Sequence, residues 1–309
     1  MSDGSIRFKE TKRFDLQRRV VSHIVSESWY SIPHVSYLYE PDVTDFYETF
    51  NSLAKSEAFI GHKTSFNTVI MRVIIEGLKA APDLNALVSY QHRKGEGLLH
   101  ICEDINVSVA MLMPDGKMIT PVILHTESMT LIELSDAAAK LQERAKNTNI
   151  DELLYQAVHA DTLKELKRFN LTVLRRIIAS NISFHRVKGL SGKEKERYYK
   201  IPESDRLTEK NLISGTITIS NIGSIYREQR GFFGILEIIP PQIFAIGIGA
   251  LQEKPSVYVE EDGQKKIGVR KILPLCLVFD HRAVDFGAMI PFLKKLDEIF
   301  LEPNVIHGW

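Results

Sequence analysis

The sequence predicts an α/β protein in which helices flank extended segments. Apolar residues recur at helical spacing in some stretches and alternate at strand spacing in others, and the two kinds of stretch follow one another along the chain. Of the 309 residues, 44% are hydrophobic and 25% are charged, a balance that is typical of a globular protein with a sizeable core. Because neither an internal repeat nor a clear linker divides the chain, we expect a single domain over residues 1–309.

The N-terminal half alternates helices with strands. Helical periodicity predicts four helices, over residues 14–29, 42–56, 65–84 and 131–147. The alternating segment 34–43 is expected to form a strand. Residues 98–124 are β-rich, with a turn at Pro114, Asp115 and Gly116.

Residues 153–211 interrupt this alternation and are interpreted as an insertion. A basic amphipathic helix occupies its first part, with an apolar side made of Leu163, Leu166, Val173, Leu174, Ile177 and Ile178. Such a helix can lie on a membrane surface, or it can pack on the protein with its basic face in solvent, and we favour packing. The charged run 193–210 predicts a solvated loop.

The last third of the chain returns to strands. Strands are predicted within residues 215–223, 238–251 and 256–280, and the last of these contains a hairpin signal at Asp262-Gly263. A final helix over residues 287–301 is expected to bury Met289, Leu293, Leu296 and Phe300.

Charge and cysteine content narrow the class of partner. Lys+Arg and Asp+Glu each number 39, so no net charge favours nucleic acid or an anionic membrane. Cys102 and Cys276 lie in apolar runs, which suits buried thiols in a reducing compartment, and we expect a cytoplasmic protein. The first residues are too charged for a signal peptide, and no apolar stretch approaches the ~20 residues of a membrane helix. We therefore expect neither a nucleic-acid partner nor a membrane.

The segment FDHRAVDFG, residues 279–287, contains the main candidate for catalytic chemistry. His281 follows an apolar strand-like run and precedes a helix, an edge from which side chains project into clefts. A general base needs a pKa near neutrality and a fixed tautomer, and histidine has both when a carboxylate holds its second nitrogen. Asp285 could orient His281, or it could pair with an arginine and only shape the loop. The same spacing at His100 and Asp104 lies within a strand and is interpreted as structural.

Ser220, at the end of the strand-like run TITIS, is the second candidate. Its hydroxyl could hydrogen-bond a developing oxyanion, or it could cap a turn at the end of the strand. Histidines and cysteines show no metal-ligand spacing, so no metal is expected. The run GIGALQ, residues 247–252, lacks the third glycine of a dinucleotide fingerprint.

Six segments together resemble the catalytic domain of the acyltransferase components of 2-oxo acid dehydrogenase complexes, whose relatives include chloramphenicol acetyltransferase. In the family's order they are LQRRVVSHIVSESWYSIPH, PDLNA, DINVSVAMLMPDGKMITPVI, GTITISNIG, IIPPQIFAIGIG and VFDHRAVD. The resemblance covers about residues 14–150 and 212–303. It implies a chloramphenicol acetyltransferase-like mixed sheet flanked by helices, and a homotrimer with each active site between two subunits.

The resemblance also implies roles for the candidate residues. His281 matches the family's general base, which takes the proton from the thiol or hydroxyl that attacks the acyl thioester. Ser220 matches the hydroxyl that stabilises the oxyanion. Asp285 matches the carboxylate of the HxxxD motif and Arg18 the N-terminal arginine that pairs with it, so both would support the site structurally. Coenzyme A, in the form of acyl-CoA, is the implied substrate.

The sequence departs from the family pattern in three ways. It begins directly at the catalytic domain, so we expect no lipoyl group on this chain, no lipoyl domain and no subunit-binding domain. The insertion at 153–211 weighs against assembly into a cubic or icosahedral core. Phe286 replaces the glycine that follows the motif aspartate, and its ring would either line the substrate channel or pack in the core.

From these observations we expect a stand-alone CoA-dependent acyltransferase that moves an acyl group between CoA and a small thiol, hydroxyl or amine acceptor. One alternative is the acyltransferase core of a 2-oxo acid dehydrogenase complex that uses a separate lipoyl protein. Another is a non-catalytic oligomeric scaffold, against which His281 and Ser220 argue. The sequence names neither the acyl group nor the acceptor.

Overall fold

Helices and strands alternate along the chain. The computed structural model describes residues 6–62, 64–113, 116–159, 190–260 and 262–309. The α-helices are α1 (Leu16–Ser31), α2 (Thr44–Leu53), α3 (Phe66–Ala80), α4 (Leu131–Lys146), α5 (Ile150–His159), α7 (Gly192–Tyr199) and α8 (Phe286–Leu301). The strands are β1 (His34–Tyr39), β2 (Ala86–Gln91), β3 (Glu96–Ile101), β4 (Val107–Val109), β5 (Met111–Leu112), β6 (Met118–Ile119), β7 (Val122–Ile123), β8 (Ile217–Asn221), β9 (Phe244–Ile248), β10 (Gln252–Val259), β11 (Lys265–Ile272) and β12 (Leu275–Asp280).

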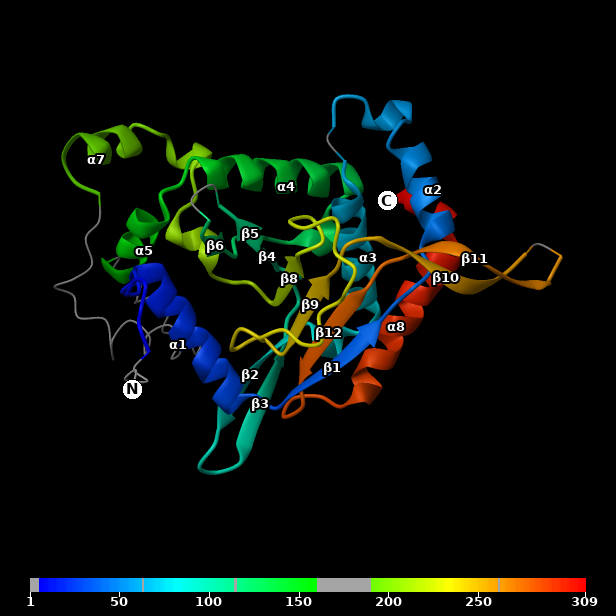
Figure 1. Ribbon diagram of the computed structural model, residues 1–309, viewed down its shortest axis with the longest axis horizontal. Helices are drawn as coiled ribbons and strands as arrows, with labels where there is room; N and C mark the ends of the chain where they lie inside the picture. Colours follow the sequence, from blue (N-terminus) through cyan, green and yellow to red (C-terminus); the bar gives the residue numbers. More distant parts are fainter. Residues whose placement is uncertain (1–5, 63, 114–115, 160–189, 261) are drawn as a thin grey trace, which may run out of the picture.

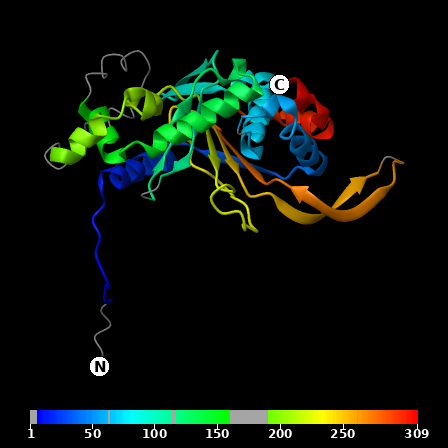
Figure 2. The ribbon, with the colours of Figure 1, turned by 90° about the horizontal axis from the view of Figure 1, so that it is seen from above.

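A six-stranded mixed sheet forms the centre of the molecule (Figure 1). Its strand order is β1-β12-β9-β8-β4-β7. β8 runs parallel to both β4 and β9, whereas β1, β12 and β7 pair antiparallel with their neighbours. Helices α3, α4 and α8 cover one face of this sheet, as Figure 2 shows. The predicted α/β class, with a mixed sheet flanked by helices, is confirmed.

The main core lies between the sheet and helices α2, α3, α4 and α8. Alternate residues of β9 and β12 enter it, because successive side chains of a strand point to opposite faces. Phe244, Ile246, Leu277 and Phe279 are all fully buried there. Burial of each such side chain stabilises the fold by about 1.5–3 kcal/mol, and Phe279→Ala would cost about 3–5 kcal/mol because it also leaves a cavity.

A long loop, residues 222–241, covers the opposite face of the sheet (yellow in Figure 2). The loop packs on a small apolar cluster made of Ile32, Ile238, Ala245, Cys276 and Val278. Two glutamines hold it in place. Oε1 of Gln229 accepts from the Ala250 N–H at 2.9 Å, and Nε2 of Gln252 donates to the Gly231 carbonyl at 2.7 Å. The loop is therefore anchored to the strands beneath it.

Two antiparallel hairpins extend from the sheet. One is β10–β11, which forms at the predicted Asp262-Gly263 turn, where Gly263 has a φ of 80° that favours glycine. The other is β2–β3, whose first strand was not predicted. Of the turn predicted at residues 114–116, only Gly116 lies among the described residues.

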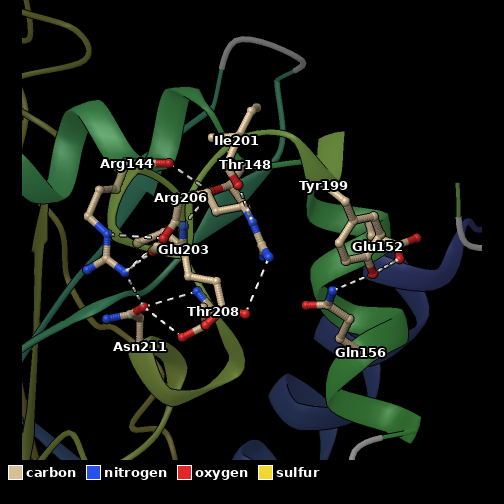
Figure 3. A network of polar contacts seen from close by, with 11 residues as sticks. Arg144, Thr148, Glu152, Gln156, Tyr199, Ile201, Glu203, Arg206, Thr208 and Asn211 are labelled. Carbon is tan, nitrogen blue, oxygen red and sulfur yellow. Dashed lines mark hydrogen bonds and ion pairs between the residues drawn. The ribbon is translucent and has the colours of Figure 1, made fainter. Parts of the chain in front are cut away.

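Most residues of the charged run 193–210 are exposed, as its composition predicts, but the run is not only a loop. It starts with helix α7, and both Tyr198 and Arg206 are buried, at 6% and 4% exposure. The guanidinium carbon of Arg206 lies 5.1 Å from the centre of the Tyr198 ring. Arg144 reaches from α4 to the Arg206 carbonyl at 2.8 Å and to Oδ1 of Asn211 at 2.9 Å (Figure 3). Backbone carbonyls and aromatic rings thus stabilise the guanidinium groups of Arg144 and Arg206. The number of charged residues in the sequence does not indicate such contacts.

A second group of polar contacts joins α7 to α5. Glu152 is 1% exposed, and its two carboxylate oxygens accept from the Leu190 N–H at 2.7 Å and from the Tyr199 hydroxyl at 2.5 Å. Figure 3 shows Tyr199 and Gln156 meeting beside this carboxylate. The basic amphipathic helix predicted in this region falls on residues 160–189, outside the described residues.

None of the helices in the described parts of the chain is both long and apolar enough to cross a membrane.

Candidate active site

His281 and Asp285 lie in the turn between β12 and α8. The strand ends at Asp280, and Asp285 is the N-cap residue of α8, although its carboxylate makes no capping hydrogen bond. Nδ1 of His281 lies 3.4 Å from Oδ1 of Asp285, and the two side chains are 48% and 87% exposed. The His281 N–H donates to the Pro33 carbonyl at 3.1 Å. The structure therefore brings together two of the predicted site residues.

The position of Asp285 favours one tautomer of neutral His281. A carboxylate only accepts hydrogen bonds, so in the neutral imidazole the proton faces Asp285 on Nδ1 and the lone pair lies on Nε2. At 3.4 Å the contact is longer than an ordinary hydrogen bond, and exposed ion pairs contribute little to stability. Asp285 thus orients the ring more than it stabilises the fold.

An ion pair between Asp280 and Arg282 stabilises the turn. No sequence pattern indicated this pair. Asp280 is fully buried, and its Oδ2 accepts from Nη2 of Arg282 at 2.6 Å while its Oδ1 accepts from Nε at 3.0 Å. The same Oδ1 accepts from the backbone N–H of Arg282 at 2.9 Å. A buried carboxylate needs such partners, and here they come from the residue on the other side of His281.

Ser220 lies on β8, on the sheet face opposite α8. Its neighbour Ile219 enters the main core, so the alternation of the strand directs Ser220 to the other face. No group in the described part of the chain hydrogen-bonds its hydroxyl. The turn that follows is held close to the end of β9, because a Cβ at Gly223 would lie 2.3 Å from the backbone of Gly249. Only glycine permits this close approach.

Ser220 and His281 do not meet within one chain. In the register of the sheet, Ser220 pairs with Gly247 of β9, and Gly247 pairs with Cys276 of β12. His281 is five residues beyond Cys276, roughly 17 Å along the strand, and two strand spacings add about 10 Å across the sheet. No single bound substrate atom could contact both side chains of the same chain.

The predicted pair of Arg18 and Asp285 is not formed within the chain either. Arg18 lies in the first turn of α1, where its backbone N–H donates to Oδ1 of Asp15 at 2.7 Å. Gln17 beside it donates to the Met118 carbonyl at 2.5 Å, so this end of α1 lies next to β6 (Figure 1). The 16 residues of α1 span about 24 Å, and the His281 turn contacts Pro33, just beyond the opposite end of the helix.

Phe286 is a surface residue next to the His281 turn. It is 42% exposed, so it does not pack in the core as one of the two sequence interpretations required. Its ring meets that of Tyr37 edge to face, with centroids 5.3 Å apart. Tyr37 lies on β1, the edge strand of the sheet, and is itself 37% exposed. The two rings form a small aromatic surface beside Asp285.

The cysteines are unsuited to nucleophilic chemistry. Cys276 is buried, and burial raises its pKa to about 11. Cys102 is only partly buried, contrary to the prediction, and partial burial also raises its pKa, with a smaller contribution from Asp104. At neutral pH both are thiols, whereas the thiolate is the reactive form.

Asp104, His125 and Glu127 form a cluster that sequence spacing did not indicate. Their potential metal-ligand atoms lie within 4.8 Å of one another. The side chains are already engaged, because Nδ1 of His125 lies 3.2 Å from Oδ1 of Asp104 and Glu127 accepts from the Ile105 N–H at 2.7 Å. These contacts account for the cluster.

The sequence matches one family model over most of its length. The model, 2-oxoacid dehydrogenases acyltransferase (catalytic domain), covers residues 8–156 and 192–307. The chain therefore belongs to this family of acyltransferase catalytic domains. Residues 157–191 remain unmatched, a shorter stretch than the predicted insertion at 153–211.

Curated relatives are components of pyruvate dehydrogenase complexes. The dihydrolipoyllysine-residue acetyltransferase component from Mycobacterium bovis is 23% identical over 290 residues, which are 93% of this chain and 40% of the relative. The corresponding protein from Staphylococcus epidermidis is 24% identical over 296 residues, 96% of this chain and 52% of the relative. The chain thus spans about half the length of these relatives, or less.

Solved structures of the same family share the fold. A study of a serine, a histidine and an asparagine in the catalytic mechanism of Azotobacter vinelandii dihydrolipoamide acetyltransferase gave a structure with a TM-score of 0.65 and 21% identity, covering 96% of this chain and 94% of that one. The cubic core of a pyruvate dehydrogenase multienzyme complex has a TM-score of 0.63 and 20% identity, with the same coverage.

The expectation of a stand-alone acyltransferase with a small acceptor is wrong. The relatives that match nearly the whole chain are acetyltransferase components of a multienzyme complex, and similar solved structures include the core of such a complex. The error came from reading the departures from the family pattern as signs of a different acceptor. The comparisons favour the complex-forming alternative.

Proposed function

We propose that this chain is the acyltransferase core of a 2-oxo acid dehydrogenase complex, in which it moves an acyl group between CoA and the dihydrolipoyl group of a lipoyl-bearing partner. The observation that supports this most is the His281–Asp285 pair, placed at the end of β12 within the matched region. The studied histidine and asparagine of the Azotobacter vinelandii enzyme are also four positions apart. We infer from this shared spacing that Asp285 corresponds to that asparagine.

His281 acts as the general base. Its Nε2 accepts the proton of the attacking thiol as the sulfur forms a bond to the thioester carbonyl carbon. The carbonyl oxygen becomes an oxyanion, to which the Ser220 hydroxyl donates a hydrogen bond. Collapse of this intermediate breaks the original carbon–sulfur bond, and the departing thiolate takes the proton back from His281. Atoms and charge therefore balance with no further reactant.

The complete site requires two chains. The wide separation of Ser220 from His281 within one chain argues that the hydroxyl of one subunit meets the imidazole of another, as in a homotrimer with interfacial sites. The high exposure of His281 and Asp285 in a single chain supports the same arrangement, since a general base works best where water is excluded.

Phe286 and Tyr37 form part of the wall of this site. Both rings are partly exposed beside the His281 turn, where they can contact the acyl group or the arm that carries the thiol. Aromatic side chains in this position add apolar contact and narrow the entrance.

An acyl-transfer assay tests the proposal. The protein is incubated with acetyl-CoA and dihydrolipoamide, and S-acetyldihydrolipoamide and free CoA are quantified together by chromatography. We expect both products in equal amounts from the wild-type protein and a near-background rate from His281→Asn. Absence of acyl transfer by an assembled wild-type protein, with acetyl-, propionyl- and branched-chain acyl-CoA alike, would contradict the proposal.

A further inference from the structure

The β2–β3 hairpin contacts Arg282 of the His281 turn through Tyr90 and His92. The guanidinium of Arg282, which is bonded along one edge to Asp280, lies with its carbon 5.0 Å from the centre of the Tyr90 ring. Its Nη1 lies 3.5 Å from Nε2 of His92, whose ring meets Tyr90 edge to face at 4.9 Å. Arg282 is therefore held between a buried carboxylate and an aromatic face of a separate hairpin.

The Tyr90 ring is itself fixed in place. Tyr90 pairs across the hairpin with Gly97, and a Cβ at Gly97 would lie 3.1 Å from Cδ2 of the ring. The ring thus lies over the glycine and uses the space that a side chain would fill. The hairpin is tied to the sheet next to β9, because the Val88 N–H donates to the Pro241 carbonyl at 2.8 Å. Tyr90 consequently contacts its own hairpin as well as Arg282.

We propose that Tyr90 is a positioning residue for His281. It keeps Arg282 against Asp280, and these two residues flank His281 in the chain, so the pair fixes the backbone on both sides of the imidazole. Without the ring, the guanidinium gains freedom to leave the carboxylate for water, and the turn loosens. A misplacement of about 1 Å at a reacting group can lower the rate by ~10²-fold. This inference rests on the role in acyl transfer proposed for His281.

The other hairpin offers a matched control. In β10–β11, the guanidinium carbon of Arg270 lies 4.8 Å from the centre of the Tyr258 ring, and its Nε donates to Oδ2 of Asp42 at 2.6 Å. A Cβ at Gly268 would lie 3.0 Å from Cε1 of Tyr258. Both places thus combine a tyrosine that packs beside a glycine with an arginine that is paired to an aspartate, although Arg270 belongs to the hairpin itself and Arg282 does not. β11 is followed by the N-terminal end of β12, whereas His281 follows the C-terminal end of that strand. Loss of Tyr258 therefore removes a tyrosine–arginine contact that lies far from the His281 turn.

Three variants test the proposal: Tyr90→Ala, Tyr90→Phe and Tyr258→Ala. For Tyr90→Ala we expect kcat to fall by roughly 10- to 100-fold with KM for acetyl-CoA changed less than about twofold. Tyr90→Phe keeps the ring face and should retain nearly the wild-type kcat. Tyr258→Ala should leave kcat unchanged, while thermal unfolding monitors the stability of all three proteins.

A second measurement does not depend on turnover. The tryptic peptide of residues 272–282 contains a single histidine, His281, so its modification by diethylpyrocarbonate can be followed by mass spectrometry. Loosening of the turn should raise the modification rate in Tyr90→Ala but not in Tyr90→Phe or Tyr258→Ala.

The outcomes separate this inference from the proposed function. If the wild-type protein lacks acyl transfer with every acyl-CoA tested but Tyr90→Ala still changes the modification rate of His281, the proposed function fails and the positioning role stands. Wild-type kcat together with a wild-type modification rate in Tyr90→Ala would overturn the inference. An equal loss of kcat in Tyr258→Ala, or in Tyr90→Phe, would overturn it as well, because the effect would then not arise from the ring face at Arg282.

Discussion

Nδ1 of His281 lies 3.4 Å from Oδ1 of Asp285 and leaves Nε2 of the ring free. Removal of the imidazole therefore removes the proposed base, together with its contact to the buried Phe279 ring, whose centroid lies 5.8 Å away. We expect His281→Ala to lower kcat by roughly 10²–10⁴-fold with only a small fall in the melting temperature and no change in the oligomeric state. Steady-state kinetics and size-exclusion chromatography check this expectation. A variant with wild-type turnover would show that another group accepts the proton.

Asp285→Ala should lower activity without lowering stability. The carboxylate is 87% exposed and caps no backbone group, so the fold does not depend on it. Loss of the partner at Nδ1 lets the imidazole sample other orientations, and we expect a fall in kcat smaller than that of His281→Ala. Asp285→Asn, which can still hydrogen-bond Nδ1, is the control and should retain more activity. A clear drop in the melting temperature of Asp285→Ala would instead point to an ion pair made with another subunit.

Chains that lack different halves of the site should complement one another. Ser220→Ala alone should lower kcat by ~10²–10³-fold because the oxyanion loses its donor. When Ser220→Ala and His281→Ala chains are co-assembled in equal amounts, about a quarter of the interfaces regain both groups if each site lies between two subunits. Activity of the mixture, compared with each variant alone, measures this. A mixture no more active than its components would place both groups in one chain.

Phe286→Gly should change selectivity more than stability. The ring is 42% exposed and its described aromatic partner is Tyr37, a contact worth about 0.5–1.5 kcal/mol beyond the burial of the ring, so its loss should cost less than that of a fully buried phenylalanine. We expect kcat/KM to rise for larger acyl groups relative to acetyl. A panel of acyl-CoA substrates, combined with thermal unfolding of the same variant, provides the measurement. An unchanged substrate ranking would exclude Phe286 from the site wall.

His34 should make the protein less stable in mild acid. Burial lowers the pKa of its ring and outweighs the raising effect of the hydrogen bond to the Ile32 carbonyl. Nδ1 lies 2.8 Å from that carbonyl, and Nε2 accepts from the Ile238 N–H at 3.2 Å, so protonation of Nε2 breaks a contact.

The direction of this effect follows from proton linkage. Because the folded state binds fewer protons at His34 than the unfolded state, its contribution to stability is complete above the ordinary histidine pKa of about 6.5. It is lost as the pH falls from there through the lowered pKa. Unfolding free energies measured between about pH 5 and 8 should show this slope in the wild type and a smaller slope in His34→Asn.

Elements set by local periodicity were predictable from the sequence. The predicted helix at 131–147 and the hairpin turn at Asp262-Gly263 appear with small shifts, because spacing and turn chemistry act over a few residues. Helix α7 and the burial of Arg206 were not predicted within the charged run 193–210, since the contacts of Arg206 include a hydrogen bond from Arg144 to its carbonyl, 62 residues away. Long-range pairing of this kind leaves no local pattern.

The candidate site likewise combines a local contact that was predictable from the sequence with long-range contacts that were not. His281 and Asp285 are four residues apart in one turn, so their contact could be anticipated. The separation of Ser220 from His281 depends on the strand order and register of β8, β9 and β12, which are non-local. Likewise, no sequence signal places Tyr90 against Arg282, because the hairpin and the turn are distant in the chain.

Under the proposed function, the distance between Ser220 and His281 would also make activity depend on protein concentration. A lone chain possesses both groups but cannot use them together, so under the proposed function the specific activity should follow the assembled fraction and decline on dilution. Newly synthesised chains would then be inactive until they assemble. Unassembled protein would therefore not hydrolyse acyl-CoA wastefully. The separation of Ser220 and His281 across strands β8, β9 and β12 would thus make activity depend on assembly of the oligomer.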